Sequence, residues 1–209
     1  MDVSVLLLVI LVLLFFCLIA TVIYLLYFVG ILGAVAVSVG KPCVKRIVIA
    51  YKNHKGPYKN CGPHFSEAYS LCPHLQSIGI YYDSPNEIPA NELRYAVGLI
   101  LAEGRDEPDP ELIKLVESHE FEITELPEID HAVKSQFPLH FDLCSIIGAW
   151  KVYPVLNDFI QRKRLSAHPF IEIYSKGIIH YFAPLSKQSD FFVPGVKYKP
   201  DYYINERDR

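Results

Sequence analysis

The chain has 209 residues, of which 51% are hydrophobic and 21% are charged, and its formal net charge is −3 at pH 7. An apolar fraction this high excludes an intrinsically disordered or fibrous chain. Nearly equal numbers of acidic and basic residues, 23 against 20, argue against a surface that binds nucleic acid directly.

The N-terminal segment has the length and composition of a membrane-spanning helix. Residues 3–40 contain no Asp, Glu, Lys, Arg or His, and residues 5–29 are almost wholly apolar. A helix rises about 1.5 Å per residue, so about 20 apolar residues cross a bilayer core of about 30 Å. A cleaved signal peptide would have an apolar region of only about 7–15 residues behind a positively charged start. We therefore expect residues 1–40 to be a transmembrane anchor with a short apolar connector.

The charges that flank the anchor predict its orientation. Lys41, Lys45 and Arg46 follow it, and neither Lys nor Arg precedes it. Positively charged flanks stay on the cytoplasmic side of a membrane. The pattern predicts a single-pass, signal-anchor protein with a lumenal N-terminus and with residues 41–209 in the cytosol. The absence of any Asn-x-Ser/Thr glycosylation site agrees with this orientation.

The residues after the anchor alternate between strand and helix patterns. Runs rich in β-branched and aromatic residues predict strands, and Asp109-Pro110 is typical of a helix start. The predicted strands lie at residues 44–51, 77–82, 92–101, 121–126, 131–137, 170–174 and 177–183. The predicted helices lie at residues 65–75, from Asp109 onward, and at 142–164. On the last helix, apolar spacing predicts an inward face of Leu143, Ile146, Ile147, Trp150, Tyr153 and Ile160.

In this order the elements form two strand–helix–strand–strand units, with a helix and a strand inserted between them. Two such units predict an α+β fold with one mixed sheet and with helices packed on one face. We assign residues 41–185 to this domain and expect residues 186–209 to be an irregular C-terminal tail. The open face of the sheet would then offer a concavity for a ligand between the two units.

Several runs resemble the gyrase-inhibitor-like, small-molecule-binding domain. They are IVIAYKNHKGPY at residues 47–58, SIGIYYDSPNEIP at 77–89, LRYAVG at 93–98 and HPFIEIY at 168–174. The combination is similar to the testis-expressed protein 264 family, a membrane-anchored group with this domain. The further features that carry this resemblance are the anchor, PELIKL at residues 110–115, KVYPVLNDFIQRKR at 151–164 and SDFFVP at 189–194.

The resemblance implies an endoplasmic reticulum protein whose cytosolic domain is an adaptor. Members of the family are receptors that deliver reticulum fragments to autophagosomes (reticulophagy), and they are linked to the valosin-containing AAA ATPase. Their receptor role depends on a C-terminal tail with an aromatic-x-x-aliphatic motif that binds autophagy modifiers. In this sequence, residues 153–156 and 170–173 match the bare pattern, but they lie inside predicted elements, where a strand-adding motif is not free. We expect an adaptor whose partner brings the motif, or one that is not an autonomous receptor.

The resemblance also implies a ligand pocket around Glu172. Alternation along residues 170–174 predicts that Ile171 and Ile173 face the helices and that Glu172 and Tyr174 lie on the open face. In the resembled family a glutamate at this position lies in the pocket, where it can pair with a cationic or polar ligand. The competing interpretation is a solvated glutamate on an edge strand.

Three other aromatic residues are candidate walls of the same pocket: Tyr51, Tyr82 and Trp150. Ordinary core or sheet packing is the competing interpretation for each of them. A membrane-tethered small-molecule-binding sensor is therefore an alternative to the adaptor, and a hydrolase on the same scaffold is a third hypothesis. No nucleophile with a matched base accompanies Glu172, so we predict no enzymatic activity.

Cofactor motifs are weak in this chain. Cys61, His64, Cys72 and His74 have the residue types of a zinc site, but Pro73 lies between the last two and separates their side chains. No glycine-rich phosphate-binding motif occurs. We expect neither a metal nor another cofactor.

Overall fold

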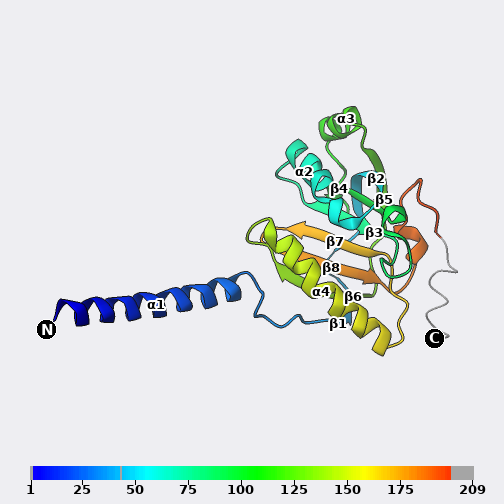
Figure 1. Ribbon diagram of the computed structural model, residues 1–209. Helices are drawn as coiled ribbons and strands as arrows, with labels where there is room; N and C mark the ends of the chain where they lie inside the picture. Colours follow the sequence, from blue (N-terminus) through cyan, green and yellow to red (C-terminus); the bar gives the residue numbers. More distant parts are fainter. Residues whose placement is uncertain (1, 43, 199–209) are drawn as a thin grey trace.

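A computed structural model describes residues 2–42 and 44–198 of the chain (Figure 1). Helix α1 (Val3–Phe28) extends away from a folded domain built around one sheet. None of the side chains of α1 is buried, and among the described residues it is the one helix long and apolar enough to cross a membrane. A helix of 26 residues is about 39 Å long, which exceeds the thickness of a bilayer core.

The sheet has eight strands in the described part of the chain, and all of its pairings are antiparallel. The strands are β1 (Ser38–Gly40), β2 (Ile47–Lys55), β3 (Ser77–Tyr81), β4 (Arg94–Glu103), β5 (Glu122–Leu126), β6 (Ala132–Pro138), β7 (Phe170–Ser175) and β8 (Ile178–Pro184). Their order across the sheet is β1-β6-β8-β7-β3-β4-β2-β5. The expected mixed sheet was wrong in this respect, because β4 lies between β2 and β3, and β8 lies between β6 and β7. The strands that a helix connects are therefore parallel but never adjacent.

The two predicted units are present as β2-α2-β3-β4 and β6-α4-β7-β8. Helix α2 comprises Gly62–Leu71 and helix α4 comprises Leu143–Arg162. The units meet at the centre of the sheet, where β3 pairs with β7 and Gly79 lies opposite Glu172. The inserted helix α3 (Pro110–Ser118) begins as predicted, because the Asp109 side chain accepts a hydrogen bond of 2.9 Å from the Glu111 amide. The duplicated α+β architecture is thus confirmed.

Helices α2 and α4 cover the same face of the sheet (Figure 1). The buried stripe of α4 consists of Cys144, Gly148, Val152, Leu156 and Ile160. The predicted inward face was therefore wrong for Leu143, Ile146 and Trp150, which are exposed. The exposed stripe of Leu143, Ile146 and Trp150 is as apolar as the buried one. The buried stripe, however, contains Gly148, where a Cβ atom would lie 2.6 Å from the Tyr181 hydroxyl, so only this side of the helix can approach the sheet this closely.

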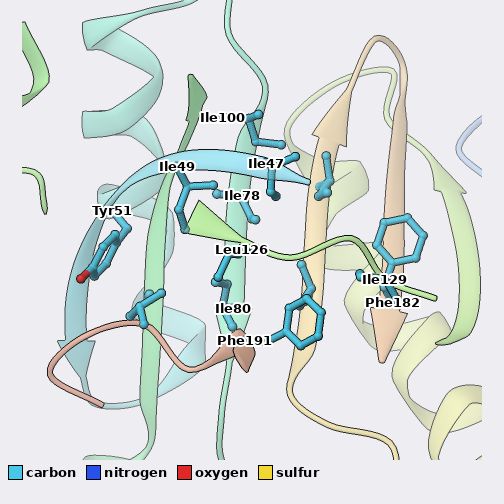
Figure 2. Packing of buried hydrophobic residues seen from close by; sticks show 14 of the residues in the cluster. Ile47, Ile49, Tyr51, Ile78, Ile80, Ile100, Leu126, Ile129, Phe182 and Phe191 are labelled. Atoms are coloured by element: carbon cyan, nitrogen blue, oxygen red, sulfur yellow. The ribbon is translucent and has the colours of Figure 1, made fainter. Parts of the chain in front are cut away.

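The opposite face of the sheet is not open. Ile171 and Ile173, which we expected to face the helices, pack there in a core cluster with Phe191 and Val193. Figure 2 shows Phe191 among the isoleucines of this cluster. Phe191 and Val193 come from the segment after β8, which includes the short 3₁₀ helix Gln188–Phe191. Strong burial of these two residues extends the folded domain beyond the boundary predicted at residue 185. The rest of the tail predicted at residues 186–209, from residue 199 onward, lies outside the described residues.

The predicted connector also contributes to the domain. Ser38–Gly40 forms edge strand β1 and pairs with residues 132–134 of β6. The sheet therefore begins before the boundary that we placed at residue 41.

Candidate ligand-binding site

Glu172 is a buried carboxylate at the centre of the sheet, beneath the two helices. Glu172 lies on β7 and is only 3% exposed. Three tyrosine hydroxyls donate hydrogen bonds to it: Tyr153 to Oε1 at 2.7 Å, Tyr174 to Oε2 at 2.7 Å and Tyr81 to Oε2 at 3.1 Å. These donors come from α4, β7 and β3, so the arrangement exists only in the folded domain.

Burial raises the pKa of Glu172 above its usual value, and the hydrogen bonds from the three tyrosines oppose this rise. The pKa of each of the three hydroxyls is also raised, chiefly by burial, so all three remain protonated donors. No Lys, Arg or His of the described residues forms an ion pair or hydrogen bond with Glu172. A buried carboxylate normally has a cationic partner, because an isolated buried charge is strongly unfavourable.

Local packing explains how the tyrosines reach the carboxylate. Glu172 and Tyr174 are two residues apart on β7, so both side chains point to the helix-covered face. On β3, Gly79 lies opposite Glu172, and a Cβ atom there would lie 2.8 Å from the Phe65 ring and 3.1 Å from the Tyr81 ring. The missing side chain at Gly79 therefore leaves room for both rings above the sheet.

A cavity of about 1040 Å³ lies between α2 and α4, and Glu172 is part of its lining. Its walls are rich in aromatic and aliphatic side chains. They include Tyr58, Phe65, Tyr69, Tyr81, Leu139, Leu143, Ile146, Tyr153, Phe170 and Tyr174. Binding sites for small molecules have this character, with a few polar groups placed in a largely apolar hollow of about 300–1000 Å³.

The ionisable groups that line the cavity are mostly acidic. Besides Glu172 they include Glu87, Asp142 and Asp83, and Asp83 is paired with Arg94 at 2.6 Å. Lys59 is the one Lys or Arg in the lining among the described residues. His168 also lines the cavity, but burial lowers its pKa to about 4, so its ring is neutral at pH 7. The cavity thus favours a ligand with positive charge.

Sequence comparison finds relatives of this chain among characterised proteins. The testis-expressed protein 264 homolog of Mus musculus is 42% identical over 168 residues, which cover 80% of this chain and 54% of that protein. Testis-expressed protein 264 of Homo sapiens is 40% identical over 168 residues, with the same coverage. Over this shared region the chain belongs to the testis-expressed protein 264 family. The chain spans about half the length of the curated relatives it matches.

Other comparisons are more distant. No family model matches the chain. The C-terminal domain of EcmrR has a TM-score of 0.45 at 15% identity, over 73% of this chain and 98% of that chain. A hydrolase from Listeria innocua also has a TM-score of 0.45, at 11% identity, over 72% of this chain and 91% of that chain. Structural similarity with TM-scores of 0.45 says nothing about the activity of this chain.

The cavity of this family member contains two of the predicted site residues directly, Glu172 and Tyr174. Both point toward the helices, rather than to the open face that we expected. Tyr82 also borders the cavity, but its ring packs on the other side of the sheet, 4.8 Å from the Phe192 ring.

The other two predicted wall residues lie elsewhere. Tyr51 packs in the core cluster on the opposite face (Figure 2). Its hydroxyl donates a hydrogen bond of 2.7 Å to Glu122. Trp150 is 73% exposed and does not line the cavity. Both assignments were wrong about the face: β2 points Tyr51 away from the helices, and Trp150 lies outside the buried stripe of α4.

Sequence reasoning missed Tyr81, Cys61 and Phe65, and it took Tyr153 for a core residue. Tyr81 had a usable signal, because alternation from Gly79 along β3 puts it on the same face as the glycine. Cys61 and Phe65 come from the start of α2, and no pattern within that segment predicts that it approaches β3. The Cys61 sulfur lies 3.8 Å from the Tyr81 hydroxyl.

The residues considered as a zinc site make separate packing contacts in the structure. Cys72 is buried in the core beneath α2, and the His64 ring stacks on His54 with 3.6 Å between centroids. Among the described residues, no group of three or more Cys, His, Asp or Glu side chains is arranged to hold a metal ion.

Proposed function

We propose that this chain is a membrane-anchored protein whose folded domain binds a small organic cation. The observation that carries the proposal is the environment of Glu172, a buried carboxylate with three phenolic donors and no cationic side chain of the described residues beside it. The cavity above it is large enough for a ligand of drug-like size.

The physical basis is complementarity between a desolvated carboxylate and a ligand cation. Ionised Glu172 is destabilised by burial, and a cation placed next to it would offset that penalty. The rings of Tyr81, Tyr153 and Tyr174 surround the carboxylate and can contact the same cation through their faces. The tyrosines then orient the carboxylate while the ligand provides its missing partner.

The same geometry favours binding over catalysis. The Cys61 thiol lines the cavity near the Tyr81 hydroxyl, and burial raises its pKa, which disfavours the reactive thiolate. Its partner is a tyrosine hydroxyl that is itself kept protonated, so it is not a general base. The hydrolase hypothesis has no support from these contacts.

Charge selectivity tests the proposal. We expect the full chain in lipid nanodiscs to bind benzyltrimethylammonium and not benzylsulfonate, an anion of similar size and shape. Isothermal titration calorimetry at pH 7.5 measures both affinities under identical conditions. Equal binding of the two ions, or preference for the anion, would show that Glu172 does not govern the cavity.

A second proposal follows from the flanking charges and from the family. The chain is an endoplasmic reticulum adaptor that displays its domain to the cytosol and binds autophagy machinery or the valosin-containing AAA ATPase. Lys41, Lys45 and Arg46 support this orientation, since positive residues near a span stay cytoplasmic. Membership in the testis-expressed protein 264 family supports the membrane adaptor role.

Protease protection tests the orientation. In sealed microsomes we expect added protease to digest the folded domain without detergent, while a tag fused before Asp2 stays protected. Survival of the domain until detergent is added would place it in the lumen and would contradict the adaptor proposal. Affinity capture of the full chain from digitonin extracts then tests for the two named partners.

A further inference from the structure

The start of helix α4 carries an exposed apolar patch, and two of its four side chains, Leu143 and Ile146, also line the cavity. We name the side chains of Phe141, Leu143, Ile146 and Trp150 the α4 patch, and they are 44%, 54%, 67% and 73% exposed. Trp150 and Ile146 are the most exposed large apolar side chains in the described part of the domain after the anchor. Positions 143, 146 and 150 share one side of a helix, since residues three or four apart are neighbours. Such patches on a folded domain mark an interaction surface.

The α4 patch lies beside the point where the anchor enters the domain. The start of α4 is on the side of the domain that faces α1 (Figure 1). Directly before the patch, the His140 ring stacks on Phe28, the last residue of α1, with 4.0 Å between the ring centroids. Directly after Trp150, the Lys151 amine donates hydrogen bonds to the carbonyl oxygens of Gly30, Ile31 and Gly33.

These contacts hold the domain against the end of the anchor. Lys151 places a positive charge on carbonyl groups that follow the C-terminal end of α1, where a cation is favourable. Gly30 has a φ of +82°, and a Cβ atom there would lie 2.9 Å from the Phe137 ring, so the turn after α1 packs directly on β6. The connector is thus bound to the same part of the domain that carries the α4 patch.

We propose that the α4 patch inserts into the interfacial layer of the same membrane that α1 spans. The last turn of a spanning helix lies at the boundary between hydrocarbon and head groups, and Phe28 in that turn contacts the residue next to Phe141. Tryptophan prefers this boundary because its ring is apolar and its N–H group can remain hydrated. The patch therefore continues the membrane contact of α1 onto the folded domain, and the domain lies on the bilayer surface in one orientation.

The chain provides its own probe, because Trp150 is its single tryptophan. For the full chain in nanodiscs with one copy per disc, we expect blue-shifted Trp150 emission that is quenched several-fold by phospholipid brominated near the head group. Aqueous iodide should quench it weakly. Strong iodide quenching without bromolipid quenching would overturn the proposal, and a blue shift without bromolipid quenching would assign the patch to a protein contact instead.

Two variants complete the test. In the double variant Trp150→Phe/Leu115→Trp, the reporter moves to the exposed side of α3, away from the junction (Figure 1). There we expect quenching by iodide and none by bromolipid. In Phe141→Asp, which keeps Trp150, a charge in the patch should shift the Trp150 signal toward that of the control. Neither Phe141 nor Trp150 lines the cavity, so benzyltrimethylammonium affinity should not change, and unchanged Trp150 quenching in Phe141→Asp would contradict docking through this patch.

Discussion

Replacing Gly98 with alanine should unfold the domain. Gly98 lies in the middle of β4 opposite Tyr51 of β2, and a Cβ atom there would lie 1.9 Å from the Ala50 carbonyl oxygen and 2.8 Å from the Tyr51 Cα atom. These are backbone atoms of a paired strand, so no side-chain rotation relieves the clash. We expect a loss of about 4 kcal/mol or more, which is a large part of the roughly 5–15 kcal/mol that stabilises a typical domain.

Gly62→Ala is the matched control for Gly98→Ala. Gly62 begins α2, and a Cβ atom there would meet nothing within 4 Å. Its stability should be unchanged or higher by about 0.5–1 kcal/mol, because alanine restricts the unfolded chain more than glycine does. Urea unfolding of the full chain in detergent, followed by near-ultraviolet circular dichroism, measures both variants. A midpoint for Gly98→Ala close to that of the unsubstituted chain would contradict the close approach of β2 and β4.

Replacing Glu172 with glutamine should weaken binding of benzyltrimethylammonium by about 10–100-fold, because the cation loses its charged partner in the cavity and close charge pairs in desolvated sites contribute about 1.5 kcal/mol or more. In the unsubstituted chain the affinity should rise with pH through the raised pKa of Glu172 and then level off. Below that pKa each pH unit should cost about tenfold in affinity, since the cation requires the ionised carboxylate. Titration calorimetry between pH 5 and pH 8.5 measures this pH dependence of the affinity. The affinity of the glutamine variant should not depend on pH in this range.

As pH rises, the cation affinity should increase, whereas the stability of the ligand-free protein should decrease. The raised pKa of Glu172 means that the folded state holds this proton more tightly than the unfolded state does. Its contribution to stability is therefore fully present below the unfolded pKa and is lost as pH rises through the folded pKa. Glu172→Gln should not lose this stability, and at pH 8 it should melt at a higher temperature than the unsubstituted chain.

Glu122→Gln is the matched control for Glu172→Gln. Glu122 also accepts a tyrosine hydroxyl, that of Tyr51 at 2.7 Å, but it lies outside the cavity. Its cation affinity and its pH profile should equal those of the unsubstituted chain. A loss of binding in Glu122→Gln equal to that in Glu172→Gln would indicate a general electrostatic effect and would remove the special role of Glu172.

Local pattern was sufficient for the helices, for every strand of the described residues except the edge strand β1, and for the repeat. The apolar run at residues 5–29, the Asp109-Pro110 start of α3 and the β-branched strands each depend on neighbours in the sequence, and each corresponds to an element of the structure. Two strand–helix–strand–strand units followed from the order of these elements. The parallel neighbours implied by a mixed sheet did not occur, because the order in which strands pair is a property of the whole sheet.

Which face of each element is buried could not be decided in this way. Both faces of β7 are covered by other parts of the protein. Residues near Phe191 cover the face with the isoleucines, and the helices cover the face with Phe170, Glu172 and Tyr174. On α4 two apolar stripes compete, and only one reaches the sheet. Trp150 was therefore assigned to a pocket wall, although it is exposed on the surface, next to Lys151, which contacts the segment after α1.

From the sequence by itself came the apolar anchor, the positive charge after it, the duplicated α+β domain and the prominence of Glu172, because composition and short-range periodicity carry this information. Only the tertiary structure decided that three tyrosines from α4, β7 and β3 meet on that carboxylate and that the α4 patch lies next to the anchor. The physical reason is that both arrangements bring together side chains from elements far apart in the chain, whose mutual positions are set by packing and strand pairing across the whole domain.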